Sequence, residues 1–156
     1  METIGAALDL LAEIPADRKI VVLGEMTEPP VPQGPAFRRQ GERVAEVATQ
    51  AIFMGSSKIC SLYGAGARKG GMNDDSISRG RHDIDLAVSL LPSDLSPGDV
   101  MLVKGARRQR LERLSFRLMG RAVECRLKTC SLPVACEHCP HLLTGTGAAE
   151  PTTPKA

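Results

Sequence analysis

The sequence predicts an α/β protein with a Rossmann-like, mostly parallel open sheet that is flanked by helices. Two short apolar runs, at residues 19–24 and 100–103, have the length and Val/Ile content of buried strands. In the segments between them, apolar residues recur at three- and four-residue spacing, as on the buried face of an amphipathic helix. Helices that alternate with short apolar strands are typical of parallel sheets covered on both faces.

The first half of the chain alternates helix, strand, loop, helix and strand. We expect a helix over residues 4–11 that ends before Pro15, and a strand over 19–24. Residues 25–35 contain four prolines within seven residues, which predicts a surface loop. A helix over 37–50 and a strand over 51–54 should follow, and Ser56 or Ser57 is a suitable cap for the next helix, in which Cys60 would be a buried thiol.

The second half repeats the alternation less clearly. Residues 64–71 are rich in glycine but match neither common phosphate-binding spacing, so we expect a helix end and a turn. Residues 72–81 are polar, with at most a weak strand near Ile77. Asp83 can cap a helix that Pro92 ends, and the strand at 100–103 then leads into a helix from Arg107.

Composition excludes several classes of function. The 156 residues suffice for one domain, and the aromatic content of 3% without Trp argues against single-stranded nucleic-acid binding by stacking. The net charge of +2 is too small to imply a polyanionic partner by itself. No apolar run approaches the ~20 residues of a membrane span, and the start lacks a basic signal-peptide region, so we expect a cytoplasmic location.

The segment around Lys104 has the pattern of a ligand-binding rim. Lys104-Gly105-Ala106 should lie at the carboxyl end of a strand, directly before a basic helix, and this is where open α/β sheets bind ligands. The helix would carry Leu111, Leu114 and Leu118 on one face. Its arginines either bind an anion or form a solvated face; they are Arg107, Arg108, Arg110, Arg113, Arg117 and Arg121.

Two acids follow the first predicted strand in the same way. Glu25 and Glu28 should come just after the carboxyl end of residues 19–24. There they could face a ligand or its metal ion. The alternative is that both are solvated acids of a surface loop.

Two segments resemble the Mur ligase family, most of all the members that add D-alanyl-D-alanine to a UDP-muramoyl tripeptide. Val22-Leu-Gly-Glu-Met26 resembles the family's Val-Leu-Gly-Asp-Met segment. Pro97-Gly-Asp-Val-Met-Leu-Val-Lys-Gly-Ala-Arg107 resembles its Pro-Gly-Asp-x-x-Leu-Val-Lys-Gly-Ser-Arg segment, and Leu111-Glu-Arg113 is similar to the Met-Glu-x that follows. The resemblance covers about residues 1–121 and implies the family's carboxy-terminal domain.

The resemblance also implies a function. This domain closes over ATP and the incoming amino component of a peptide-bond-forming ligase of peptidoglycan precursor synthesis. Lys104 and Arg107 would then bind an anionic ligand group, and Glu25 a polar or cationic one. We expect ATP and Mg²⁺ to be bound with a central ATPase domain that this chain lacks. The chain would start just after the family's Asp-x-Tyr-Asn-Ala-x-Pro-x-Ser motif, as a truncated ligase that is inactive alone or works with a partner chain.

Four cysteines cluster after the basic segment, outside the family pattern. They are Cys125, Cys130, Cys136 and Cys139, with His138 and His141 as reserve ligands. Thiolates are soft ligands, so the cluster predicts a structural zinc site, with an iron–sulfur cluster or unligated thiols as the alternatives.

The sequence thus predicts three parts and leaves two functions open. The parts are a Mur-type domain at 1–121, a metal knuckle at 122–143 and a disordered tail at 144–156. The first function is that of a ligase domain with nucleotide and peptidoglycan-precursor ligands. The second is that of a non-catalytic Rossmann-like binding or regulatory module.

Overall fold

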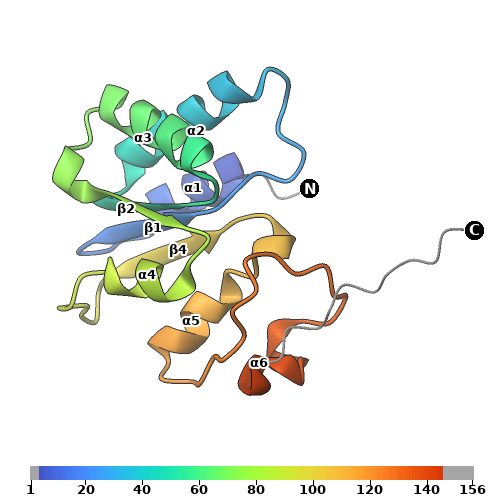
Figure 1. Ribbon diagram of the computed structural model, residues 1–156. Helices are drawn as coiled ribbons and strands as arrows, with labels where there is room; N and C mark the ends of the chain where they lie inside the picture. The colour runs from blue at the N-terminus through green and yellow to red at the C-terminus, as the bar shows by residue number, and fades with distance from the viewer. Residues whose placement is uncertain (1–3, 146–156) are drawn as a thin grey trace, which may run out of the picture.

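The computed structural model describes residues 4–145, in which four parallel strands form one open sheet (Figure 1). The strands are β1 (Lys19–Leu23), β2 (Gln50–Met54), β3 (Ile77–Arg81) and β4 (Val100–Lys104). Their spatial order is β3-β2-β1-β4, so the chain moves outward from β1 and then crosses back to its other side. The α/β class with a parallel open sheet is therefore confirmed.

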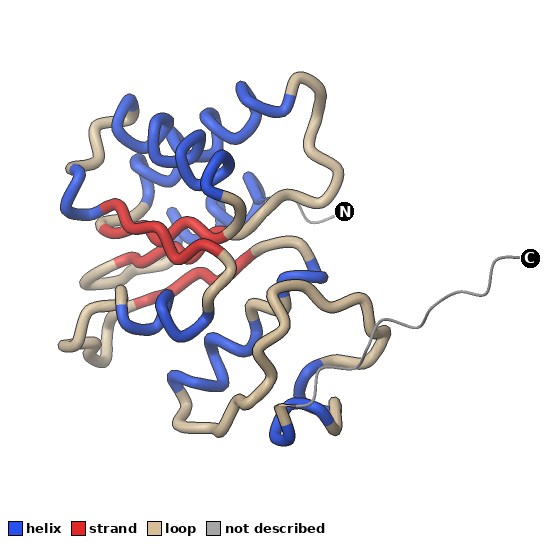
Figure 2. The backbone as a smooth tube through the Cα atoms, viewed as in Figure 1, coloured by secondary structure: helices blue, strands red, loops and turns tan. Residues whose placement is uncertain are grey.

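Helices cover both faces of the sheet (Figures 1 and 2). One face carries α1 (Ile4–Glu13), α2 (Gln33–Val47) and α3 (Ser57–Lys69); the other carries α4 (Ile84–Ser89) and α5 (Glu112–Leu118). The connections β1–β2 and β2–β3 move along the sheet in one direction, and the connection β3–β4 moves back in the other. Because such connections are right-handed, the helix α4 of the returning connection must lie on the opposite face of the sheet from α2 and α3.

The predicted strands are apolar throughout because both of their faces are buried. In β1, Val21 and Leu23 pack into the core beneath α1, α2 and α3, while Ile20 and Val22 pack into the core beneath α4 and α5. All four side chains are fully buried. A third, smaller cluster joins the end of α5 to the segment after it and consists of Phe116, Val123, Cys136 and Leu142.

The first helix prediction that needs correction is the one for residues 37–50. The helix α2 begins at Gln33, since Pro35 fits the first turn of a helix, where its missing N–H is not needed. It ends at Val47, and Gln50 already belongs to β2. The proline-rich loop is correspondingly shorter.

In the glycine-rich residues 64–71, α3 continues to Lys69, so the expected helix end and turn come only at Gly70 and Gly71. The reason is close packing between helices. A Cβ at Gly66 would lie 2.0 Å from the Arg38 carbonyl oxygen, and a Cβ at Gly41 would lie 2.1 Å from that of Tyr63. The glycines therefore let the backbones of α2 and α3 approach each other.

The helix predicted from Arg107 also starts later. Residues Arg107–Gln109 form a single 3₁₀ turn, and Arg110 then adopts a left-handed conformation with φ of 53°. The α-helix proper is α5, which begins at Glu112. The remaining short elements are 3₁₀ turns at Asp74–Ser76 and Cys136–His138, and α6 (His141–Thr144).

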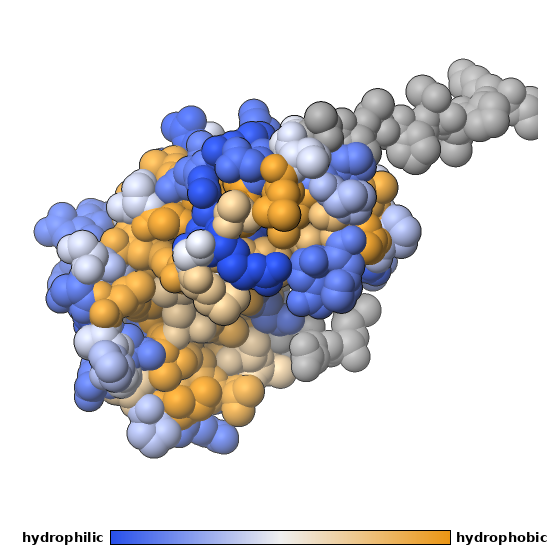
Figure 3. Space-filling model, turned by 90° about the horizontal axis from the view of Figure 1, so that it is seen from below, coloured by the Kyte–Doolittle hydropathy of each residue, from blue (hydrophilic) through white to orange (hydrophobic). Residues whose placement is uncertain are grey.

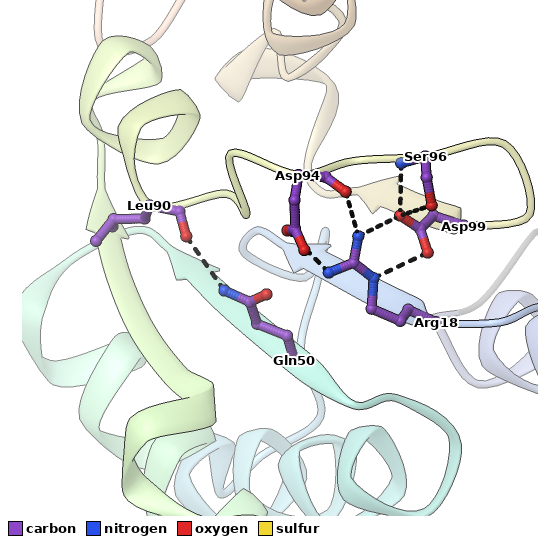
Figure 4. Close-up of polar contacts among 6 residues, drawn as sticks. All are labelled: Arg18, Gln50, Leu90, Asp94, Ser96 and Asp99. Atoms are coloured by element: carbon purple, nitrogen blue, oxygen red, sulfur yellow. Dashed lines mark hydrogen bonds and ion pairs between the residues drawn. The ribbon is translucent and has the colours of Figure 1, made fainter.

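An ion-pair cluster closes the amino-terminal edge of the sheet (Figure 4). Arg18 precedes β1 and pairs with Asp99, which precedes β4, at 2.6 Å, and with Asp94 at 3.0 Å. The Ser96 N–H also donates to the Asp99 carboxylate. The Pro-Gly-Asp part of the Lys104 segment is therefore structural and lies at the opposite end of β4 from Lys104.

In the view from below, hydrophobic residues reach the surface between hydrophilic ones (Figure 3). Leu86, Leu118 and Met119 are among the large apolar side chains that are exposed. Within residues 4–145, none of the helices combines the length and the apolar character that a bilayer crossing demands. Most of the predicted tail at 144–156 lies outside the described residues.

Candidate functional site

The two segments that carry the family resemblance end side by side on one rim of the sheet. β1 and β4 are neighbours, and the Gly24 N–H donates to the Lys104 carbonyl at 2.7 Å. The Ala106 N–H donates to the Glu25 carbonyl at 2.8 Å, which continues the pairing beyond the strands. In the order β3-β2-β1-β4 the chain reverses direction between β1 and β4, and such switch points are where open α/β sheets bind ligands.

A residue that the sequence did not reveal closes the crevice between these two strands. Gln109 is 3% exposed, and its side-chain oxygen accepts the Glu25 N–H at 2.7 Å. A Cβ at Gly24 would lie only 2.3 Å from that oxygen and 3.0 Å from the Gly105 Cα. Gly24 and Gly105 both lack the side chain that would prevent this contact. In the sequence, Gln109 stands between two arginines, and no motif marks it as a functional residue.

Glu25 is buried at the rim and joins three strand ends. Its carboxylate accepts the Ser56 N–H at 3.3 Å and pairs with Arg108 at 3.2 Å. His82 lies 3.8 Å from the same carboxylate. Glu25 is therefore not the solvated loop acid of the alternative interpretation, while Glu28 is exposed.

The predicted binding residues gather around Lys104. One pocket of about 440 Å³ is lined by Lys104, Glu25 and Gln40, and a second of about 310 Å³ is lined by Lys104, Arg107 and Glu112. The side-chain oxygen of Gln40 is shielded from solvent and accepts no hydrogen bond from the described residues.

Three arginines of the basic segment bind the chain that follows it. Arg107 donates to the Pro133 carbonyl at 2.6 Å, and Arg110 donates to that of Leu132. Arg113 donates to the carbonyls of Cys125 at 3.1 Å and Leu127 at 2.8 Å.

Arg110 and Arg113 are only 3% and 2% exposed. The interpretation as a solvated helix face is therefore wrong for these two side chains. Backbone carbonyls supply the hydrogen bonds that the buried Arg113 guanidinium needs, whereas the Nε of Arg110 is buried without a partner among the described residues.

The cysteine cluster does not present four sulfurs to a common point. Within the described residues, no three His, Cys, Asp or Glu side chains are placed to hold a metal ion. Cys136 packs against Phe116, Val123 and Leu142, and this burial, with nearby Glu112, raises the pKa of its thiol to about 12. A protonated thiol in an apolar cluster does not fit a thiolate ligand. The metal site stays a prediction.

Comparisons with protein-family models, with curated proteins and with solved structures returned no match for this chain. The functional assignment therefore rests on the residues themselves. The observations that bear on it are the two motif segments, the rim on which they meet and the side chains that line the pockets there.

Proposed function

We propose that this chain is a Mur-type carboxy-terminal ligase domain, which binds ATP and the incoming amino component across the β1/β4 rim. One observation carries the proposal: Gly24-Glu25 and Lys104-Gly105, which come from the two resembling segments, are hydrogen-bonded neighbours at the switch point. The carboxyl ends of parallel strands share one edge of the sheet, and the order β3-β2-β1-β4 makes these two segments direct neighbours on it.

The rim carries the charges that such a domain requires. Lys104 and Arg107 supply cationic groups for a phosphate or carboxylate, and Glu25 supplies a buried carboxylate that is oriented by Ser56 and Arg108. The contribution of the domain is to fix the reactants, because positioning turns a bimolecular step into an effectively unimolecular one.

Reconstitution in trans tests the ligase role. The full chain is mixed with the amino-terminal and central domains of a ligase that adds D-alanyl-D-alanine, and ligation is followed by mass spectrometry and phosphate release. Each component alone should be inactive and the mixture active. K104A should reduce the rate about tenfold or more, because a hydrogen bond to a charged group contributes about 1.5–3 kcal/mol.

The matched control is R38A, which removes an exposed cation of α2 that lines neither of the two pockets at Lys104. It should leave the rate of the mixture unchanged. An inactive mixture in which the chain remains folded by circular dichroism would overturn the ligase proposal, as would an unchanged rate in K104A.

The alternative is a non-catalytic binding module, and the partnering of Glu25 favours it. The Glu25 carboxylate already pairs with Arg108 and accepts the Ser56 N–H, which is how a structural acid is held. On this alternative, the chain would bind its ligand without restoring ligation in the mixture. Binding of ATP or D-alanyl-D-alanine by the chain alone, measured by calorimetry beside the ligation assay, separates the two functions.

A further inference from the structure

A further cavity of the protein lies apart from the Lys104 rim. It measures about 850 Å³ and opens beside the carboxyl ends of β2 and β3. Its walls come from the β2–α3 turn, the β3–α4 connection, α5 and residues 123–128. This size falls within the 300–1,000 Å³ of small-molecule sites.

The lining of this cavity is strongly cationic. Five basic side chains line it against two carboxylates, and His82 adds a further nitrogen; the basic residues are Arg79, Arg81, Arg113, Arg126 and Lys128. Both carboxylates already have partners: Asp83 accepts the Leu86 N–H as the cap of α4, and Asp85 pairs with Arg117 and Arg126. Glu25, behind His82, pairs with Arg108.

Three of the cations have no acidic partner. In the part of the chain that the structure describes, no carboxylate pairs with Arg79, Arg81 or Lys128. The Nδ1 atom of His82 is also buried without a hydrogen-bond partner. Unpaired cations that share a concave surface favour a bound anion, because the cavity walls concentrate their field.

The backbone at the end of β3 is shaped to place two of these cations together. A register shift between Phe53 and Met54 pairs them with Arg79 and Arg81, and it skips Gly80. Arg81 then adopts a left-handed conformation with φ of 55°, which a non-glycine residue rarely takes. Bulges and strained residues of this kind occur at sites where a side chain is re-aimed.

The opposite wall of the cavity is partly apolar and comes from the segment after α5. Val123 and Leu127 line it, and the carbonyl of Leu127 is held by Arg113. The buried Arg113 thus fixes this wall to the α/β layer. The cavity thus offers both cations for charged oxygens and apolar side chains for a less polar group.

We propose that this cavity binds a phosphorylated small molecule. Arg79, Arg81 and Lys128 bind the phosphate oxygens, and Val123 and Leu127 contact the organic part. Arginine pairs with phosphate in a bidentate manner, and fixed cations favour a multiply charged group over a single carboxylate. The site is distinct from the Lys104 rim and does not depend on the proposed ligase function.

Calorimetry on the full chain tests this site with pyrophosphate, AMP and citrate as probes. Pyrophosphate and AMP should bind, and R79A/R81A should weaken both about tenfold or more, since each lost charge-assisted contact removes a substantial part of the affinity. R38A, whose side chain is exposed on α2 and does not line the cavity, should leave both affinities unchanged. The comparison is repeated in the K104A background, so that any phosphate bound at the Lys104 rim does not contribute. L127S should weaken the binding of AMP and leave the affinity for pyrophosphate unchanged, because only AMP has an organic part that can contact Leu127.

Circular dichroism confirms that each variant is folded before its affinity is compared. No binding of pyrophosphate or AMP up to about 10 mM would overturn the proposal, as the affinity would then be too weak for a built site. Unchanged affinity in R79A/R81A would also overturn it. If citrate binds as strongly as pyrophosphate, the cavity is a general anion-binding surface and the proposed phosphate site is wrong. If K104A alone abolishes binding, the ligand binds at the Lys104 rim and not in this cavity.

Discussion

The Asp99 carboxylate lies at the amino-terminal edge of the sheet, at the far end of β4 from Lys104. It is 6% exposed and receives hydrogen bonds from the Arg18 guanidinium and the Ser96 N–H. The hydrogen bond from Arg18, followed by that from Ser96, lowers the pKa of Asp99 to about 2. The motif that resembles a ligase segment therefore divides into a structural beginning and a candidate binding end.

The lowered pKa gives stability a defined pH dependence at this residue. Because the folded pKa is below the unfolded value of about 3.9, the ionised Asp99 stabilises the protein fully above that value. This contribution is lost as the pH falls through 3.9 towards 2. We expect D99N to lower the Tm by a few degrees at pH 7, and we expect its difference from the wild type to shrink towards pH 2.

The control for this measurement is D9N, which removes an exposed partner of Arg43. Exposed ion pairs contribute little, so its Tm should follow that of the wild type. A D99N variant with unchanged Tm at pH 7, measured by calorimetry, would contradict the assigned role of Asp99.

At the scale of elements, glycine decides how α2 and α3 pack. Gly66 faces the Arg38 backbone, with 2.0 Å between its hypothetical Cβ and the carbonyl oxygen, whereas a Cβ at Gly64 meets only side-chain atoms at 3.4 Å or more. G66A should destabilise the protein by about 1–3 kcal/mol, because helix backbones must move apart. Urea unfolding measures the free energy.

G64A is the matched control in the same helix. Its Cβ makes ordinary contacts, and alanine favours a helix over glycine by about 0.5–1 kcal/mol. It should therefore be neutral or stabilising. Equal destabilisation by G64A and G66A would mean that any added side chain disturbs α3. The close approach of α2 would then not be the cause.

The elements differ in how well the sequence predicts them. The strands β1, β2 and β4 are predicted to within one residue, because each contains a continuous run of four apolar residues. β3 is an edge strand with the sequence Ile-Ser-Arg-Gly-Arg, and only Gly80 in it is buried, so it gives a weak signal. Residues 64–69 are misjudged because local glycine content does not show which helix will pack against them.

The candidate site is predicted less completely than the strands. Glu25 and Lys104 follow strand ends, and this position alone predicts that they share a rim. The burial of Arg113 cannot be predicted, since its partners are backbone carbonyls of residues 125 and 127, which any sequence would supply. The role of Gln109 cannot be predicted either, because its side chain accepts a hydrogen bond from a backbone N–H, that of Glu25.

At the scale of the whole molecule, the Cys-rich segment packs against the α/β layer. Three arginines bind its carbonyls, and Cys136 completes a small apolar cluster with Phe116 of α5. The same segment forms one wall of the cationic cavity. Its attachment therefore determines whether that cavity exists.

Breaking the attachment should release the segment without unfolding the sheet. R113M removes hydrogen bonds to Cys125 and Leu127 but keeps an unbranched side chain of similar length. We expect alkylation of Cys136 by iodoacetamide to accelerate about tenfold or more, because each bond from a charged group contributes about 1.5–3 kcal/mol. Cys60, which is fully buried on the inner face of α3, should remain protected and serves as the internal control.

The same labelling experiment decides between attachment by arginine and attachment by a metal. If arginines hold the segment, wild-type Cys125, Cys130 and Cys139, which are partly exposed, react readily with or without a chelator. If a zinc ion holds it, all three stay protected until the chelator is added, because thiolates bound to zinc react slowly. Chelator-dependent protection, together with unchanged Cys136 labelling in R113M, would show that a metal and not Arg113 fixes the segment, and mass spectrometry reads both results from one sample.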